Sequence, residues 1–373
     1  MTVSINGTNG LVFNDGSSQA TAATGFGFKN RIINGAMVID QRNAGAAVTA
    51  TGAYPVDRWQ LNNATDASLS VARSTDVPSG QGFTNSVVVT TTTADASIGA
   101  AQYANLQHRI EGFNFADMGF GASGASSITL SFWVKATVSG NYSVAIYNSA
   151  ENRINPQQFS VSAGGTWEKK TITIAGDTTG TWLTNNGIGA NVTFYYALGS
   201  NFLGSSGWNS GGTYGVSGQS NALASNSNTF AITGVQLEKG STATSFDYRP
   251  YGAELVLCQR YYFKHTENRY TVSSTSNGSN VCAMVYYPVP MRATPTITTQ
   301  LTNANYNANP AAANSWDLTN PGQADLTKTG TYNVLIEAPT AYSAIITWYG
   351  ATLSGYPTGM NIRGLYTEAS SEL

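Results

Sequence analysis

Residues 231–263 read AITGVQLEKGSTATSFDYRPYGAELVLCQRYYF, and they join two kinds of structure. A hydrophobic strand pattern comes first, followed by a short polar turn and a break at residues 249–251. Beyond the break, Leu255, Cys258 and Tyr262 share one face of a helix, and the proline just before them suits a helix start. We therefore expect the last strand of one β domain to lead through a connecting helix, residues 250–263, into a second domain.

The composition predicts an all-β protein. Only 10% of the 373 residues are charged, whereas ordinary globular proteins have about 25%. The chain holds 20 Tyr, 14 Phe and 7 Trp, and aromatic and β-branched residues are enriched in strands. Leu, Lys, Glu and Arg, which would build amphipathic helices, are scarce. We expect short strands separated by Gly, Ser and Asn.

Alternating apolar residues predict a jelly-roll β-sandwich over residues 27–249. In the clearest strand, residues 126–135, every second side chain is apolar and faces one way. These apolar residues are Ile128, Leu130, Phe132 and Val134. A strand beginning at Tyr142, after a Ser-Gly-Asn turn, is expected to be its hairpin partner. Further strands are expected at residues 167–174, 192–198 and 230–237, a spacing typical of a sandwich.

Both ends of the chain also read as β structure. After the helix, strand patterns at 281–287, 332–337 and 344–349 predict a second, smaller β-sandwich domain over residues 264–373. Residues 1–26 form an extended N-terminal segment whose apolar residues are few. Its one short strand pattern comprises Leu11, Val12 and Phe13. Because so little apolar surface cannot offset the ordering entropy, we expect this strand to order in assembly with other chains; a frayed terminus is the alternative.

The charge pattern excludes several function classes. A net charge of −2 leaves no basic footprint for nucleic acid. No apolar run reaches the roughly 18 residues of a membrane span, and the first residues lack the pattern of a signal peptide. We therefore expect no nucleic acid, no membrane insertion, and assembly in a cytoplasm. Cys258 and Cys282 are expected to be reduced thiols, with a disulfide between them as the alternative.

Catalytic patterns are weak, so we predict no catalytic residue, no metal site, no cofactor and no enzymatic activity. His108 and His265 are the only histidines, and neither belongs to a nucleophile or zinc motif. Asp57 and Arg58 are expected to form a buried or edge ion pair with each other. Glycan cleavage, which needs two carboxylates, stays open as a third possibility. Its candidates are single acidic residues in turns and at strand ends: Glu111, Asp117, Glu151 and Asp177.

Several motifs in fixed order resemble a family of bacteriophage tail-fibre and other virion-associated proteins. They are KNRIINGAM at 29–37, YPVDRW at 54–59, ITGVQLE at 232–238, YRPY at 248–251 and CQRYY at 258–262. The resemblance covers almost the full length. It implies a receptor-binding protein of the virion tail, assembled in the host bacterial cytoplasm as a homotrimer. It also implies that residues 1–26 attach to other tail or baseplate proteins. A purely structural virion component, such as a baseplate or tail adaptor or a capsid decoration, is the alternative.

A second resemblance concerns residues 28–248. The runs LSFWVKA at 130–136, SGNY at 139–142 and TWEKK at 166–170 are similar to jelly-roll carbohydrate-binding modules. This similarity implies a host surface glycan as the receptor.

Exposed aromatic residues are the candidates for glycan binding. The loop at residues 199–229 is nearly free of charge and holds Trp208 and Tyr214 among Gly, Ser and Asn. An aromatic plate packs on the apolar face of a sugar while amides and hydroxyls bond its rim, and so long a loop is often functional. For Trp208 two readings are equal, a glycan platform and a packing anchor on the sandwich or a neighbouring subunit. Trp182 is a second exposed-aromatic candidate.

Overall fold

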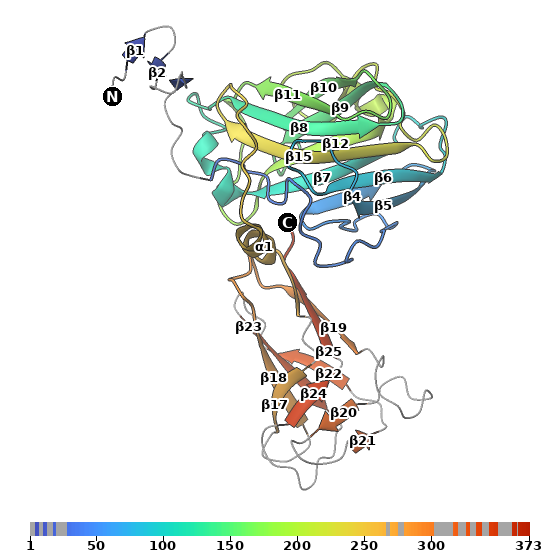
Figure 1. Cartoon of the computed structure of the whole chain (residues 1–373), viewed down its shortest axis with the longest axis vertical. Coiled ribbons are helices and arrows are strands. Elements are labelled where there is room, and N and C mark those ends of the chain that lie inside the picture. Colours follow the sequence, from blue (N-terminus) through green and yellow to red (C-terminus); the bar gives the residue numbers. More distant parts are fainter. Residues whose placement is uncertain are drawn as a thin grey trace.

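The computed structural model describes the backbone of residues 4–6, 10–12, 18–19, 28–265, 269–274, 280–301, 316–319, 326–328, 333–337, 343–349, 360–363 and 365–373. Side chains are described for residues 28–264, 286–297, 343 and 368–373. The described residues form an all-β fold with one short α-helix, as predicted, and the main body is a jelly-roll-like sandwich (Figure 1). No helix in the described part of the chain is long and apolar enough to span a membrane.

Two five-stranded antiparallel sheets form the sandwich. The first has the order β10-β9-β12-β7-β4 and the second the order β11-β8-β15-β6-β5. The first sheet comprises β4 (Trp59–Asn63), β7 (Tyr103–Glu111), β9 (Gly140–Tyr147), β10 (Ile154–Val161) and β12 (Ile188–Leu198). The second comprises β5 (Ser68–Ser74), β6 (Ser86–Thr93), β8 (Ile128–Ala136), β11 (Glu168–Ile174) and β15 (Thr229–Lys239).

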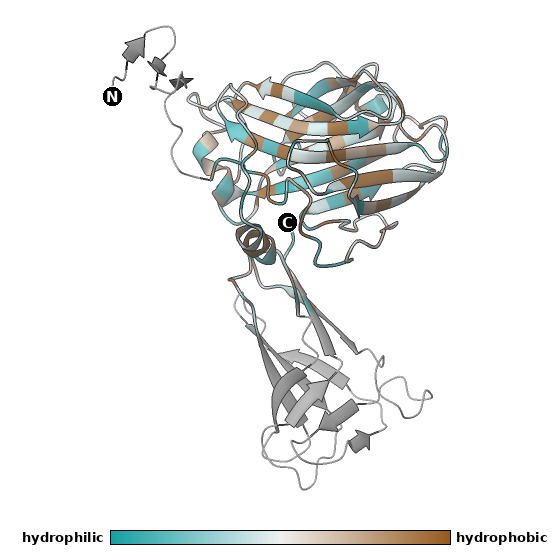
Figure 2. Ribbon diagram, in the orientation of Figure 1, coloured by the Kyte–Doolittle hydropathy of each residue, from teal (hydrophilic) through white to brown (hydrophobic). Residues whose placement is uncertain are grey.

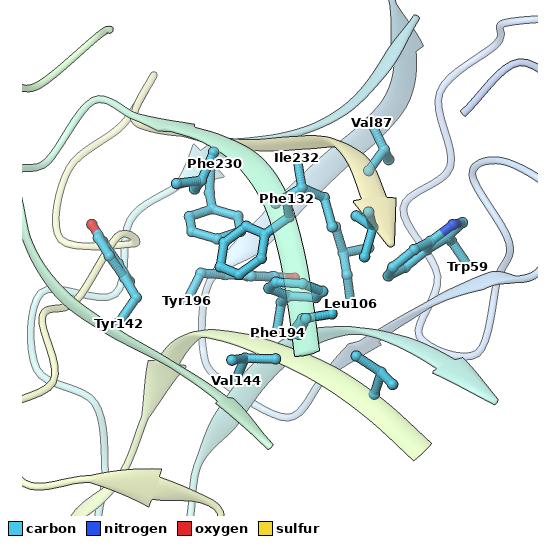
Figure 3. Packing of buried hydrophobic residues seen from close by; sticks show 14 of the residues in the cluster. Trp59, Val87, Leu106, Phe132, Tyr142, Val144, Phe194, Tyr196, Phe230 and Ile232 are labelled. Carbon is cyan, nitrogen blue, oxygen red and sulfur yellow. The ribbon is translucent and has the colours of Figure 1, made fainter. Parts of the chain in front are cut away.

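The core lies between these sheets, where alternate residues of each strand meet. Brown and teal alternate along the strands in Figure 2, as expected of sheets with one buried face. Phe132 of β8 packs edge-on against Phe194 of β12 with ring centroids 4.9 Å apart, so the contact joins the two sheets. Figure 3 shows both rings between the strands, with Trp59 and Phe230 beside them. All four of these side chains are at most 1% exposed.

The predicted hairpin between β8 and β9 is wrong. The two strands follow each other in sequence, but β8 pairs with β11 and β15 while β9 pairs with β10 and β12. The turn between them therefore crosses from one sheet to the other. The alternation requires only that one face of each strand is buried, and facing sheets satisfy this as well as a hairpin does. Tyr142, Val144 and Ile146 of β9 are fully buried, like the alternate residues of β8. Both apolar faces are buried when they face each other across the sandwich.

The predicted helix is present but ends earlier than expected. Helix α1 spans Tyr251–Gln259, and strand β16 (Tyr262–His265) begins three residues later. Tyr262 therefore belongs to a sheet, paired with Ser370, and not to the helix face. Cys258 is buried in α1 and free; the side chain of Cys282 lies outside the described residues, as does that of His265.

Strands also form the two ends of the chain. At the N-terminus, β1 (Ser4–Asn6), β2 (Gly10–Val12) and β3 (Ser18–Gln19) make a three-stranded sheet. Leu11 and Val12 lie in β2; their side chains and all of Phe13 fall outside the described part. Beyond α1, a three-stranded sheet has the order β16-β25-β19 and a seven-stranded sheet the order β21-β20-β24-β17-β18-β23-β22. The domain boundaries at residues 26, 249 and 263 stay predictions.

These C-terminal strands come from separate parts of the sequence. They are β17 (Arg269–Ser274), β18 (Asn280–Tyr286), β19 (Thr296–Leu301), β20 (Trp316–Thr319), β21 (Leu326–Lys328), β22 (Asn333–Glu337), β23 (Ser343–Tyr349), β24 (Met360–Arg363) and β25 (Leu365–Ser370).

Asp57 and Arg58 are both buried, but the expectation that they pair with each other is wrong. Asp57 lies 3.5 Å from Arg42 and accepts a 2.5 Å hydrogen bond from the Gln41 amide. Arg58 instead forms an ion pair with Glu372, at the far end of the sequence. Residues 57 and 58 lie in the turn before β4, where Arg58 has a left-handed backbone with φ of 72°, so each side chain meets a different neighbour.

Candidate functional site

The outer face of the first sheet carries rows of polar side chains. On β7, Asn105, Gln107 and Arg109 face outward, whereas Leu106, His108 and Ile110 face the core. The strand register places Asn105 beside Asn62 of β4 and Tyr195 of β12. It likewise places Gln107 beside Thr193, and Arg109 beside Asn191. The sheet therefore presents amides and hydroxyls in rows that run across three strands.

Hydrogen bonds hold these rows in fixed orientations. The Gln107 amide donates to the Tyr147 hydroxyl at 2.6 Å, and this hydroxyl lies 3.0 Å from the Thr193 hydroxyl. The Asn62 amide donates to the Asn105 oxygen at 3.0 Å. Because each side chain is held by a neighbour, little rotamer entropy is left to lose when a ligand binds.

Aromatic rings from a separate loop stand over one end of the rows. Tyr214 lies 5.5 Å from Tyr147 and 5.9 Å from Phe202, measured between ring centroids, and Phe202 lies 5.9 Å from Tyr103. The loop is fastened to the sheet where the Val216 amide donates to Ser143 of β9 at 3.0 Å. The rings and rows together line a cleft of about 260 Å³.

The cleft has one carboxylate and one cation among its described lining residues, Glu151 and Arg109. The Tyr214 hydroxyl donates to Glu151 at 2.5 Å. Glu151 has a left-handed backbone with φ of 54°, a conformation that side chains adopt at a cost and that is often found at functional sites. Burial raises the pKa of Tyr147, Tyr195 and Tyr214 above the ordinary value for a phenol, which is already neutral at pH 7.

The structure separates the three predicted aromatic residues. Tyr214 lines the cleft and is half-buried. Trp208 turns away from it: its indole donates to the Ala175 carbonyl at 2.8 Å, and its ring contacts Phe120 and Trp182 edge-on. This geometry is that of a packing anchor. Trp182 is only 7% exposed, so the expectation that it is an exposed aromatic is wrong; Phe115 stacks on it and Asp177 accepts from its indole.

Most of the cleft was not foreseen in the sequence. The unpredicted lining residues include Tyr103, Asn105, Gln107, Arg109, Tyr147 and Tyr195. The strand at residues 103–111 reads YANLQHRIE, in which Asn105, Gln107 and Arg109 occupy every second position. Two amides at alternate positions of one strand, Asn105 and Gln107, are the signal that could have found it.

The acidic candidates for catalysis are dispersed. Glu111 is buried and holds Arg260 at 2.6 Å and the Tyr261 hydroxyl at 2.7 Å. Asp177 holds Arg153 in a two-bond pair at 2.7 and 2.8 Å. Asp117 bonds Arg31 at 2.8 Å. Only Glu151 lies at the cleft.

Of the two histidines, the structure describes the side chain of His108. His108 is buried in β7 and contacts the Ile33 backbone; burial lowers its pKa well below the usual value. Among the residues whose side chains are described, no three of His, Cys, Asp and Glu gather as a metal site would require.

No family model matches the chain, and no curated protein matches its sequence. Solved structures to which this chain is similar include the enzymatically active domain of bacteriophage CBA120 tailspike protein 4, with 14% identity and a TM-score of 0.31 over 56% of this chain. This chain spans about a fifth of the tailspike, 21% of its length. A family 4 carbohydrate-binding module has 15% identity and a TM-score of 0.28, covering 55% of this chain and 97% of the module.

A family 11 carbohydrate-binding module from a cellulosomal cellulase of Clostridium thermocellum is also similar, with 11% identity and a TM-score of 0.28. The match covers 54% of this chain and 97% of the module.

Proposed function

We propose that this protein binds a cell-surface glycan in the cleft on the outer face of the β10-β9-β12-β7-β4 sheet. The observation that carries the proposal is the pairing of fixed amide and hydroxyl rows with an aromatic rim. Sugar hydroxyls need donors and acceptors at set positions, which the Gln107 and Asn105 amides supply. The apolar face of a sugar ring needs an aromatic surface, which Tyr214 and Phe202 supply.

The lining chemistry favours binding without cleavage. Glycosidases generally use two carboxyl groups on either side of the scissile bond, and Glu151 is the one carboxylate among the described residues of the cleft. Its partner Tyr214 donates to it directly. We therefore propose a binding protein rather than a depolymerase.

The virion setting rests on the ordered sequence motifs. We propose a tail-fibre-like receptor-binding protein that assembles as a homotrimer, sits in the virion tail and attaches to tail or baseplate proteins through residues 1–26. The competing proposal is a structural virion component with no receptor. Light scattering on the purified protein tests the trimer, and glycan binding separates the two proposals.

Substitutions in the cleft should weaken glycan binding while the fold survives. We expect Tyr214→Ala and Gln107→Ala each to lower affinity about tenfold or more, the loss typical of a residue that carries much of the binding energy. A glycan array identifies the ligand, and calorimetry then measures the affinity of each variant. Trp208→Ala is the matched control from the same loop. It should lower the melting temperature and leave the affinity of the folded protein unchanged. A well-folded double cleft variant with unchanged affinity would place the receptor site elsewhere.

Deleting residues 1–26 tests the attachment role of Leu11, Val12 and Phe13. We expect the melting temperature of the sandwich to stay nearly constant, because its core begins beyond this segment at Ile32. Incorporation into particles should be lost. Melting curves and immunoblots of purified virions measure the two effects, and a truncated protein that assembles normally would contradict the assignment.

A further inference from the structure

Arg109 connects the cleft to residues 371–373. It is the outward-facing residue of β7 that follows Gln107, and it lines one end of the cleft. Two residues later in the same strand, Glu111 bonds Arg260 beyond helix α1. The Arg109 guanidinium donates from Nη1 to the Leu373 carbonyl. The end of the cleft where Arg109 lies is therefore the end nearest the C-terminal part of the chain.

The residue before Leu373 is held by two arginines of the sandwich. The Glu372 carboxylate accepts from Arg42 Nη2 at 3.0 Å and from Arg58 Nη1. Arg58 is 2% exposed, and its Nη2 also donates to the backbone carbonyl of Arg109. Both the backbone and the side chain of Arg109 thus contact the same buried cluster.

From the other side, Arg292 holds these residues in place. Its Nε donates to the Ser371 carbonyl at 2.7 Å and its Nη2 to the Glu372 carbonyl at 3.0 Å. Arg292 lies between β18 and β19, the C-terminal strands, and its own amide donates to the Arg260 carbonyl at 2.8 Å. Figure 1 shows the C-terminus against the base of the sandwich, beside α1.

We propose that residues 371–373 are positioning residues for the glycan site, and that they make its affinity depend on the C-terminal strands. The inference rests on the proposed function. A guanidinium has five N–H donors in a rigid fork, and the contact with Leu373 occupies Nη1 of Arg109. This contact fixes the orientation of the Arg109 guanidinium, so that its remaining N–H donors can bond sugar hydroxyls. Arg109 touches the sugar; Glu372 and Arg292 act through it.

Substitutions that loosen residues 371–373 should weaken glycan binding only while Arg109 is present. Ordering a long side chain costs affinity on binding, and releasing Arg109 from its support should lower affinity roughly three- to tenfold. Two substitutions should loosen residues 371–373. Glu372→Gln removes the charge that pairs with Arg58, and Arg292→Ala removes the hydrogen bonds to the Ser371 and Glu372 carbonyls. Arg292→Ala leaves the buried pair intact, so it carries the test if the Glu372 variant does not fold.

The experiment is a double-mutant cycle on the full chain, read by calorimetry with the best glycan from the array. The glycan affinity of Glu372→Gln and of Arg292→Ala is measured with each substitution alone and combined with Arg109→Ala. Melting temperatures are recorded in parallel. We expect glycan affinity to fall three- to tenfold when Arg109 is present, and not to change when Arg109 has been replaced by alanine. Equal losses in both backgrounds, or no loss in either, would overturn the inference while the glycan site stands. If the unaltered protein binds no glycan, the proposed function fails and this inference falls with it.

Discussion

Replacing Phe194 by alanine should lower the free energy of unfolding by about 3–5 kcal/mol, the usual effect of emptying an aromatic site in a packed core. Phe194 is fully buried, and its ring centroid lies 4.9 Å from that of Phe132 and 6.0 Å from that of Trp59. The contact with Phe132 joins the two sheets, so the cavity would open between them. Chemical denaturation followed by circular dichroism measures the loss.

The matched control is Phe113→Ala. Phe113 is 62% exposed, so its removal should change stability by no more than about 0.5 kcal/mol. A loss below about 1 kcal/mol for Phe194→Ala would mean that the sheets close over the missing ring, and that the core is less tightly packed than the ring contacts indicate.

Gly35→Ala should also be strongly destabilising. A Cβ at Gly35 would lie 2.1 Å from the backbone carbonyl oxygen of Val235 in β15. That oxygen already accepts from the Asn30 amide, and the Val235 amide donates to the Gly35 carbonyl at 2.9 Å. Neither backbone segment can retreat without breaking these bonds. We expect a loss of about 3 kcal/mol or more, the upper part of the range for overpacking.

Gly252→Ala provides the comparison for Gly35→Ala. Gly252 lies in α1, and a Cβ there would meet nothing within 4 Å. Alanine favours a helix over glycine by about 0.5–1 kcal/mol, so this variant should be slightly more stable. Melting temperatures of the two variants should therefore move in opposite directions. A Gly35→Ala protein as stable as the parent would show that the first loop of the sandwich can shift away from β15.

The strands could be predicted because burial on one face leaves a period of two in the sequence. Ile128, Leu130, Phe132 and Val134 alternate as expected, and each is fully buried. The pairing of strands was harder to foresee. The alternation in β8 and β9 is the same whether they form a hairpin or lie in opposite sheets, because either arrangement buries one face of each.

The site could be predicted only in part, because its residues converge from distant strands. Tyr214 stood out as an aromatic in an uncharged loop, and it does line the cleft. Trp208 stood out equally, yet the structure packs it against Phe120 and Trp182. Nothing in the loop sequence states which of the two rings faces the sheet. The partners of Arg58 and Asp57 were likewise set by tertiary contacts, since Glu372 is 314 residues from Arg58.

That separation has a consequence for how the chain matures. Synthesis runs from the N-terminus, and the strands of the sandwich, through β15, are complete more than a hundred residues before Glu372 is made. Contacts between residues so far apart form late in folding, because a long loop must close first. During translation Arg58 therefore lacks the Glu372 carboxylate until the last residues of the sequence are made. A chain that stops before Glu372 leaves the Arg58 guanidinium buried without this carboxylate, and an unpaired buried charge destabilises a fold.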